Sequence, residues 1–365
     1  MNVLFVLSQT TVTGAETYAL SLASALKELG HSLIFVSDTL RSSGGFKYIP
    51  LPIHQGNESL LGRARNILSL REIIEREGVD LIHAHSRAAN LVSAAAARSL
   101  RSRRVPLVVT VHGRWRNHFA FRRLPCLGER TIAVCPALKR YLVEEIGRPE
   151  AGIRMIPNGI DTQAFSPGRP RPGAEPTLLM VGRFTGQKGE AARHLMRSVF
   201  PEVLGKMAEV SITIFGTSPG EQDRRLAEEL NRGCGRHAVT LLDREDDLPG
   251  LYRNATAVIG SGRVALEAMS CGRPVIAIGE SSAPGLVTPS GFDKAFDSNF
   301  GDCGEWDLFK GQKHLAGDIH NAFRNKSLSA SLADWGRNTA LSLFDSRKIA
   351  FQIDVLYREL AVEAR

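Results

Sequence analysis

Short hydrophobic runs alternate with amphipathic stretches along most of the chain. In the first half, the runs VLFVL, LIFVS, DLIHA, PLVVTVH and TIAV predict β-strands. Helices are predicted at AETYALSLASALKELG and after Cys135. Strands that alternate with helices in this way form a parallel sheet covered by helices.

The alternation stops at SPGRPRPGAEP, residues 166–176, whose Pro and Gly content is typical of a linker. A second series follows, with strands predicted at LLMVG, SITIFG, AVTLL, ATAVIG and PVIAIG. No sequence repeat links the two halves, so we expect two distinct domains of similar construction, 1–165 and 177–346. The final amphipathic helix, within 347–365, needs a surface to cover. Ligands of such sheets bind beyond the carboxyl ends of the strands, and we expect the site in a cleft between the domains.

The composition is that of an ordinary globular protein. Of 365 residues, 43% are hydrophobic and 23% are charged. The apolar runs are shorter than the ~20 residues that span a bilayer, and MNVLFVLSQ lacks the features of a signal peptide. The five cysteines form no CxxC pair, which argues against structural zinc and a disulfide framework. We therefore expect a cytoplasmic protein.

The net charge of +8 is concentrated in one region. Between Leu81 and Pro125 the chain has nine arginines and no Asp or Glu, and aromatic residues are interleaved with the last four. One interpretation is a solvated basic face. The other is a patch for an anionic acceptor or for the inner membrane face, where each basic residue contributes ~1 kcal/mol. The residues of this second interpretation are Arg114, Trp115, Arg116, Arg122 and Arg123. No nucleic-acid-binding motif is present, so we do not expect a nucleic-acid partner.

The stretch GSGRVALEAMSCGRPVIAIGE, residues 260–280, places a carboxylate in a helix between two apolar strands. Arg263 and Glu267 share one helical stripe, so the stripe can face water with an i,i+4 ion pair of ~0.3 kcal/mol. The alternative uses Gly260 and Gly262, which let a ligand approach the helix start, where amides and the helix dipole favour phosphate. One turn later, the carboxylate could accept two hydrogen bonds from a ribose diol.

A second segment favours this alternative. VGRFTGQKG places Arg183 and Lys188 in the loop after a predicted strand. Two cations at this spacing suit a diphosphate, because each charged hydrogen bond contributes ~1.5–3 kcal/mol. Together with a diol-binding Glu267, they describe a site for a nucleoside diphosphate.

The segments LEAMSCGRPVIA, VGRFTGQKG, IPNGIDTQAFSP, GAETYALSLASALKELGH and DLIHAHS followed by TVHG resemble the retaining, family 4 type of GT-B glycosyltransferases. The motifs occur in that family's order and extend from residue 1 to about 280. The resemblance implies a GT-B fold, in which two Rossmann-like domains with parallel sheets face a central cleft. It also implies a nucleotide-sugar donor held mainly by the second domain, a final helix that returns to the first, and no metal or other cofactor.

The same resemblance assigns roles to residues of the second domain. Arg183 and Lys188 match the pair that binds the pyrophosphate and stabilises the leaving group, and Glu267 matches the ribose-binding glutamate. Gly262 and Arg263 match positions whose backbone amides bind the distal phosphate. The base is expected to contact backbone groups, with Gly216 among them.

In the first domain, Gly14 matches a glycine where donor and acceptor approach each other, and His112 matches a histidine near the transferred sugar. Without the resemblance, His112 is simply a histidine that caps a strand end. Asn158, Gly159 and Asp161 match a motif near the domain junction, which we interpret as structural.

Three positions depart from the family pattern. Ile259 stands where the family has a first glutamate, eight residues before Glu267, that contacts the donor sugar. Thr13 replaces one of two glycines in the first loop, and residues 281–312 follow the usual Gly-rich stretch only in part. The first departure leaves the identity of the donor sugar open.

The predicted function is transfer of a sugar, with anomeric retention, from a nucleoside-diphosphate sugar to a hydroxyl of a glycan or lipid-linked acceptor. Synthesis of a cell-surface polysaccharide or lipopolysaccharide is the expected context. Two alternatives remain: another GT-B nucleotide-sugar enzyme, such as an epimerase or an inverting transferase, and a non-catalytic nucleotide-binding scaffold.

Two other clusters suggest metal sites less strongly. In DREDDLPG, Asp247 fits a helix N-cap better than a metal ligand. His83 and His85 alternate on a strand and share one face, but no third ligand is evident, and packing at a strand end is the favoured interpretation.

Overall fold

The protein is described here by a computed structural model. It describes residues 1–8, 14–40, 44–56, 59–101, 103–115, 127–168, 175–243, 247–304 and 314–364. The strand–helix alternation forms two α/β units. The first contains residues 1–159 and 346–365, and the second contains residues 160–345.

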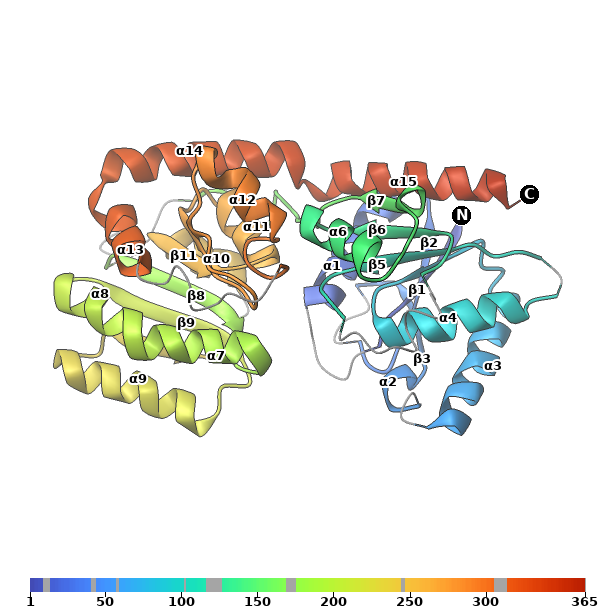
Figure 1. Ribbon diagram of the computed structural model, residues 1–365, viewed down its shortest axis with the longest axis horizontal. Helices are drawn as coiled ribbons and strands as arrows, with labels where there is room; N and C mark the ends of the chain where they lie inside the picture. Colours follow the sequence, from blue (N-terminus) through green and yellow to red (C-terminus); the bar gives the residue numbers. More distant parts are fainter. Residues whose placement is uncertain are drawn as a thin grey trace. The chain divides into compact units, whose positions relative to one another are not determined.

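The first unit is built on a seven-stranded parallel sheet with the strand order β3-β2-β1-β4-β5-β6-β7 (Figure 1). Its strands are β1 (Asn2–Val6), β2 (Ser32–Ser37), β3 (Lys47–Pro50), β4 (Leu81–Ala84), β5 (Leu107–Val111), β6 (Arg130–Ala133) and β7 (Ile153–Met155). In the register of the central strands, Val3 of β1 lies opposite Leu33 on one side and Leu81 on the other. All residues of β4 and β5 are buried, as expected for central parallel strands covered on both faces.

Helices cover this sheet, and two of them begin at a serine cap. The helices are α1 (Gly14–Glu28), α2 (Ile53–Gly56), α3 (Leu60–Arg76), α4 (Arg87–Ser99), α6 (Pro136–Glu144) and α15 (Ser346–Glu363). Ser59 caps α3 by accepting a hydrogen bond from the Gly62 amide at 2.9 Å, and Ser86 caps α4 in the same way.

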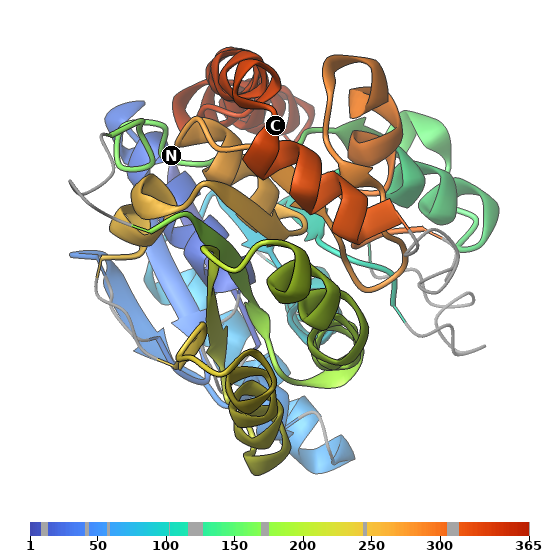
Figure 2. The ribbon, with the colours of Figure 1, turned by 90° about the vertical axis from the view of Figure 1, so that its left-hand side faces the viewer.

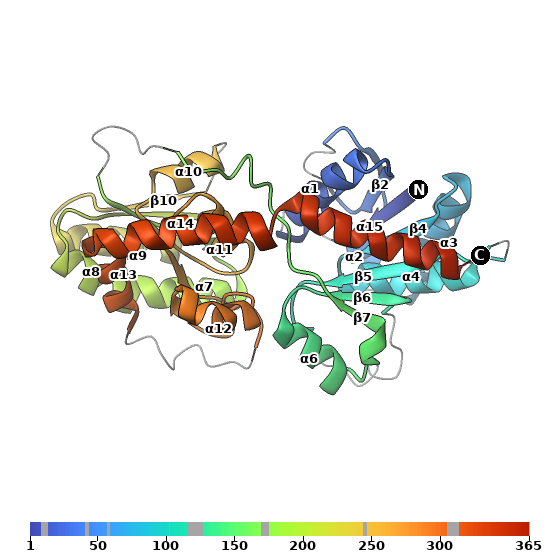
Figure 3. The ribbon, with the colours of Figure 1, turned by 90° about the horizontal axis from the view of Figure 1, so that it is seen from above.

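The final helix, α15, belongs to the first unit and lies along α1 (Figure 3). It buries Ile349, Ile353 and Tyr357 in one core with Tyr18 and Leu22 of α1. This contact gives the amphipathic C-terminal helix the surface that its apolar stripe requires.

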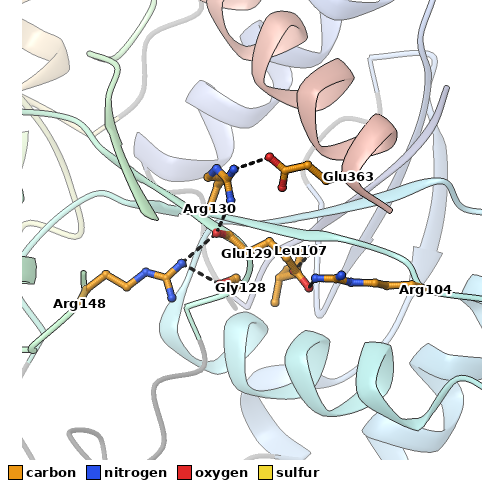
Figure 4. Close-up of polar contacts among 7 residues, drawn as sticks. All are labelled: Arg104, Leu107, Gly128, Glu129, Arg130, Arg148 and Glu363. Atoms are coloured by element: carbon orange, nitrogen blue, oxygen red, sulfur yellow. Dashed lines mark hydrogen bonds and ion pairs between the residues drawn. The ribbon is translucent and has the colours of Figure 1, made fainter. Parts of the chain in front are cut away.

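A polar network fastens the far end of α15 to the amino ends of β5 and β6 (Figure 4). Arg130 donates to Glu363 at 2.6 Å, and Glu129 accepts from the Leu107 amide at 2.8 Å. Arg148 donates to the carbonyl oxygens of Gly128 and Glu129 at 2.8 and 3.0 Å. Burial lowers the pKa of Arg148, but its two carbonyl partners keep the half-buried guanidinium hydrogen-bonded.

The second unit has a six-stranded sheet with the order β10-β9-β8-β11-β12-β13. Its strands are β8 (Thr177–Arg183), β9 (Ser211–Thr217), β10 (Val239–Leu242), β11 (Ala257–Gly260), β12 (Val275–Ala277) and β13 (Gly285–Leu286). All neighbours are parallel except the edge pair β12–β13. The prediction of parallel α/β sheets is therefore confirmed, with one short antiparallel strand added at an edge.

Helices cover both faces of this second sheet (Figure 2). One face packs against α7 (Gly186–His194), the π-helical turn η2 (Leu195–Val199), α8 (Phe200–Lys206), α9 (Glu221–Cys234) and α13 (Leu315–Arg324). The other face packs against α10 (Leu248–Asn254), α11 (Arg263–Ser270), α12 (Phe292–Asp297) and α14 (Lys326–Leu343). Alternate residues of each strand supply the two cores, as the pleat requires: Leu178 lies in one and Leu179 in the other.

The division between the units comes before the predicted linker. Ile160 and Phe165 are buried in the second unit's core, and the Ile160 amide donates to the Phe344 carbonyl at 2.9 Å. The Phe165 ring packs edge-on against Tyr252. These contacts place residues 160–168, which the sequence analysis divided between the first domain and the linker, in the second unit.

We predict that replacement of Ile353 by Ala destabilises the first unit. Ile353 is fully buried against α1, and removal of such a side chain costs ~2–5 kcal/mol through lost burial and the cavity left behind. Urea unfolding of the full chain measures the change. Val355→Ala is the matched control, because Val355 lies on the exposed side of the same helix at 41% exposure. Equal losses in the two variants would contradict the packing described.

Candidate functional site

The predicted phosphate-binding residues meet at the carboxyl edge of the second sheet. Arg183 is the last residue of β8, and Lys188 lies in the first turn of α7. β11 lies directly beside β8 and leads through Ser261 and Gly262 into α11. Because these strands are parallel, the segments reach the same edge of the sheet, where ligands of open α/β sheets bind.

Two carboxylates lie among these cations, and the sequence analysis assigned neither of them. Glu280, which follows β12, pairs with Arg183 at 2.5 Å. Since β8 and β12 flank β11, this pair spans the carboxyl end of β11. Asp302 Oδ2 lies 2.9 Å from Lys188 Nζ, and Asp302 Oδ1 accepts a hydrogen bond of 2.6 Å from the Ser261 hydroxyl. Each cation of the predicted pair is therefore held by an acid of the same unit.

The two glycines before α11 are required by the local packing. A Cβ atom on Gly260 would lie 2.2 Å from Val264 Cγ1. Gly262 has a φ of +53°, and a Cβ there would lie 2.7 Å from Asp302 Oδ2. The absence of a side chain leaves room for Val264 of α11 at position 260 and for the Asp302 carboxylate at position 262. The packing of the protein itself therefore requires glycine at both positions, whether or not a ligand binds.

Gly216 lies near the end of β9, opposite Gly182 of β8. A Cβ on Gly216 would lie 2.7 Å from both the Gly182 carbonyl oxygen and the Phe184 ring. The structure thus accounts for this glycine by the close approach of its own chain. Its predicted contact with a nucleotide base remains a prediction.

Glu267 is buried rather than solvent-facing. Only 4% of the residue is exposed, and its two oxygens have separate partners: Arg263 Nε lies 2.7 Å from Oε1, and the Tyr252 hydroxyl donates to Oε2 at 2.8 Å. The expected Arg263–Glu267 ion pair is confirmed, whereas the water-facing stripe is wrong because α11 turns this side toward α10. Burial raises the pKa of Glu267, while Arg263 and Tyr252 oppose the rise by favouring the carboxylate.

His112 follows β5 in the first unit, at the carboxyl edge of that sheet. Its ring lies 5.0 Å from Tyr18 and 5.8 Å from His85 between centroids. Burial lowers the pKa of His112 to about 4, and the Asn158 side chain partly opposes this shift. Among the described residues no partner reaches Nε2, so a neutral ring keeps one nitrogen available.

His83 and His85 share one face of β4, with ring centroids 4.1 Å apart. His83 is fully buried between the Tyr357 hydroxyl, 2.5 Å from Nδ1, and the Thr110 hydroxyl, 2.7 Å from Nε2. The packing interpretation is therefore confirmed for His83. His85 is 3% exposed, and neither of its nitrogens has a hydrogen-bond partner within the described ranges.

Gly14 is the first residue of α1. Among the described residues, nothing lies within 4 Å of a Cβ placed there. The described packing of the first unit thus gives no reason for glycine at this position. Its predicted role beside the substrates remains a prediction.

Two family models match the chain. Glycosyltransferase Family 4 matches residues 12–164, and Glycosyl transferases group 1 matches residues 175–294. The first match lies in the first unit except for residues 160–164, and the second match lies in the second unit. Together they span most of the chain. The chain is a glycosyltransferase with the GT-B fold.

Curated relatives of this glycosyltransferase are similar to it at low identity. It is 24% identical over 303 residues to a subunit of the phosphatidylinositol N-acetylglucosaminyltransferase of Arabidopsis thaliana, a match that covers 76% of this chain. The chain spans about 64% of that relative's length. It is also 24% identical over 291 residues to the UDP-Gal:alpha-D-GlcNAc-diphosphoundecaprenol alpha-1,3-galactosyltransferase of Escherichia coli, covering 68% of this chain and 69% of the relative.

Solved structures share the fold. Anabaena Alr3699/HepE in complex with UDP and glucose superposes with a TM-score of 0.72 at 19% identity, covering 97% of this chain and 98% of that one. At this identity, the likeness shows the fold of the glycosyltransferase but not its substrates.

The basic segment of the glycosyltransferase is divided by β5. Arg103 and Arg104 precede the strand, whereas Arg114 and Trp115 follow it, so the two groups lie at opposite ends of β5. Arg114 pairs with Glu145, and its guanidinium lies 4.9 Å from the centre of the Tyr141 ring. The Trp115 carbonyl accepts from the Tyr141 hydroxyl at 2.9 Å. Arg116, Arg122 and Arg123 lie outside the described residues.

Asp247 caps α10 by accepting a hydrogen bond of 2.8 Å from the Gly250 amide, as predicted. Within the described ranges, no group of three or more His, Cys, Asp or Glu side chains is placed to hold a metal ion. A search of the same ranges for a helix of the length and apolarity needed to cross a membrane finds none.

Four residues at these sites escaped the sequence analysis for two reasons. Ser261 lies inside the GSG motif, but the sequence analysis considered only the two glycines there. Asp302 lies 41 residues after Ser261, and Glu280 lies 97 residues after Arg183, so only the folded sheet brings each pair together. Tyr252 precedes Glu267 by 15 residues, on a separate helix. For Glu280 the sequence did offer a signal, because this acid directly follows the end of a predicted strand in IAIGE.

We predict that the first unit loses stability as the pH falls from ~6.5 to ~4. Burial lowers the pKa of His83 to about 3, of His112 to about 4, and of His85 well below 6.5. In this window the unfolded chain binds protons that the folded chain does not, so the unfolding free energy decreases by up to ~1.4 kcal/mol per pH unit for each histidine.

Urea unfolding at several pH values measures this slope. His85→Leu should reduce this slope by the contribution of one histidine, up to ~1.4 kcal/mol per pH unit. His54→Leu, at an exposed residue, is the control and should leave the slope unchanged. A slope that is the same in wild type and His85→Leu would contradict the assignment.

We also predict that Tyr252→Phe destabilises the second unit by ~1–3 kcal/mol, because Glu267 would lose one of two partners while it stays buried. Denaturant unfolding measures the loss. Tyr48→Phe is the control, since its half-buried hydroxyl donates to the backbone oxygens of Ser37 and Asp38 and its removal leaves no buried carboxylate short of a partner. The assignment fails if both variants unfold alike.

Proposed function

We propose that this glycosyltransferase moves a sugar from a nucleoside-diphosphate sugar to a hydroxyl of a glycan or lipid-linked acceptor, with retention at the anomeric carbon. The observation that carries the proposal is the convergence of Arg183, Lys188 and the start of α11 at one edge of the second sheet. Two cations beside a helix N-terminus with glycine backbone are the chemistry that a diphosphate requires.

In this proposal the diphosphate replaces the carboxylates of Glu280 and Asp302 as the partner of the two cations. Arg183 would leave Glu280 and Lys188 would leave Asp302, and both would donate to phosphate oxygens. The same cations would then stabilise the negative charge that grows on the nucleoside diphosphate as the sugar departs. Because the positive charge comes from these side chains, the transfer is proposed to need no metal ion or other cofactor.

The amides of Gly262 and Arg263, at the first turn of α11, are proposed to donate to the distal phosphate. Glu267 is proposed to accept the ribose hydroxyls. Each of its oxygens already has one partner, and a carboxylate oxygen has a second lone pair to offer. Since Glu267 is 4% exposed, the Arg263 side chain would have to turn aside to admit the ribose.

In the first unit, His112 is proposed to face the transferred sugar as a neutral ring. Its pKa of about 4 keeps it uncharged at neutral pH, so Nε2 can exchange a hydrogen bond with a hydroxyl without adding charge. No protein nucleophile is assigned. The acceptor would attack the face that the diphosphate leaves, with the leaving phosphate taking the acceptor's proton.

The nucleotide and the acceptor are proposed by comparison. The E. coli relative is named for a UDP-galactose donor and a diphosphoundecaprenol-linked acceptor, and the Anabaena structure holds UDP and glucose. UDP is therefore the first nucleotide to test, and a lipid-linked acceptor at the inner membrane face is the first acceptor class. Synthesis of a surface polysaccharide or lipopolysaccharide is the proposed context.

The test is calorimetric binding of UDP, GDP and ADP. We expect one of them to bind, and Lys188→Ala to weaken it ~10–100-fold, as the loss of a charged hydrogen bond predicts. Lys206→Ala is the matched control: Lys206 is also paired with an acid, Glu202, but lies on α8 away from the site, and the change should leave binding intact. Absence of binding by all three nucleotides, or equal affinity in wild type and Lys188→Ala, would refute the proposed site.

A further inference from the structure

Asp302 borders the proposed phosphate site, yet the proposed function gives it no role. Its side chain is 16% exposed, and both oxygens are engaged, one by Ser261 and the other by Lys188. Oδ2 also lies 2.7 Å from the point where a Cβ on Gly262 would stand. The carboxylate is therefore packed against the backbone that leads into α11.

The backbone around Asp302 is held in a conformation that side chains rarely adopt. Asn299 and Phe300 have φ values of +51° and +58°, in the left-handed region that disfavours residues with a Cβ. The Phe300 ring is fully buried against Phe292 and Phe344, and the Asn299 carbonyl accepts from the Gly262 amide at 3.0 Å. Strained backbone of this kind persists where the surrounding structure enforces it, and it is concentrated at functional sites.

The same loop is fastened to the segment that carries the other acid. The Gly301 carbonyl accepts from the amides of Ser281 and Ser282 at 2.9 and 3.1 Å. Gly279 approaches Gly301 so closely that a Cβ on Gly279 would lie 2.2 Å from the Gly301 carbonyl carbon. The loop that carries Asp302 is thus hydrogen-bonded both to Gly262, before α11, and to Ser281 and Ser282, after β12. The position of Asp302 therefore does not depend on its ion pair with Lys188.

An acid in this position opposes the binding of a bare diphosphate. Once Lys188 turns to a phosphate, Asp302 places a negative charge beside another negative charge and loses one of its two donors. The hydroxyls of a sugar attached to the distal phosphate would supply the missing donors, because a carboxylate only accepts hydrogen bonds. The acid would then weaken binding of the free nucleoside diphosphate while it favours the sugar nucleotide.

Ile259, where the family resemblance expects an acid, does not serve this purpose. It is 1% exposed and lies in the apolar core with Met180 and Ile276. Asp302 approaches the start of α11 from a different segment, 43 positions further along the chain.

We propose that Asp302, held by Ser261, accepts hydrogen bonds from hydroxyls of the donor sugar and so makes the site prefer the sugar nucleotide over the free nucleoside diphosphate. The inference rests on the proposed function, since it presumes that the diphosphate binds at Arg183 and Lys188. Glu280 offers the contrast: it also pairs with a cation of the site, but it is 28% exposed, and no second side-chain hydrogen bond to it is found among the described residues. We assign it only the role of a counter-ion.

The test compares Asp302→Asn with Glu280→Gln by calorimetry, using the nucleoside diphosphate that binds and its glucose, galactose and N-acetylglucosamine derivatives. Both variants should bind the bare diphosphate several-fold more tightly, because each removes a competing negative charge. Glu280→Gln should tighten the sugar nucleotides by the same factor. In Asp302→Asn, the ratio of sugar-nucleotide affinity to diphosphate affinity should fall at least 10-fold for the sugar nucleotide that binds the wild-type protein most tightly.

An unchanged ratio in Asp302→Asn would overturn the inference and leave Asp302 a counter-ion. Asp302→Glu covers the case in which Asp302→Asn does not fold, because it keeps the charge but displaces the carboxylate. It should change the relative affinities of the three sugars, and an unchanged order and ratio would overturn the inference equally. Failure of the proposed function is distinguishable, since then no nucleoside diphosphate would bind the wild-type protein in a way that depends on Lys188.

Discussion

The hydrogen bond from the Gly262 amide to the Asn299 carbonyl is the contact on which the arrangement of the second unit's site depends. It joins the start of α11 to the loop that follows α12. The position of α11 determines where Ser261 and Glu267 lie, and the position of the loop determines where Asp302 lies. Only glycine at position 262 permits the contact, because its φ is positive and a Cβ would collide with Asp302. A single backbone contact thus holds together the two segments that supply Ser261 and Asp302, both of which contact Lys188.

The sequence contained enough to predict most of the fold. Ten apolar runs were expected to be strands, and every one became a parallel strand, because buried parallel strands are continuous apolar segments. The strands that were not anticipated, β3, β7 and β13, are short edge strands whose residues are partly exposed. The unit boundary was misplaced by a few residues, since Ile160 and Phe165 precede the Pro- and Gly-rich segment yet pack into the second core.

The site was predictable where its chemistry is local in sequence. Arg183, Lys188 and Gly262 sit in motifs that can be recognised from a few neighbouring residues, and the structure brings all three to one edge of the sheet. The acids that pair with the cations come from distant segments, and no local pattern marks Asp302 as a partner of Lys188. The burial of Glu267 could not be predicted from the sequence either. Its helical stripe could have faced water or another helix, and the contact with Tyr252 of α10 shows that it faces a helix.

The helix α15 has a consequence for how the chain is made. The second unit is continuous in sequence, whereas the first unit includes residues 346–365, which follow the whole of the second. Until those residues leave the ribosome, the core around Tyr18 and Leu22 lacks Ile353, and His83 lacks the Tyr357 hydroxyl. Domains usually fold in the order in which they are made, N-terminal first. Here the first unit cannot complete its core until the whole second unit has been translated, so we expect the second unit to complete its fold first.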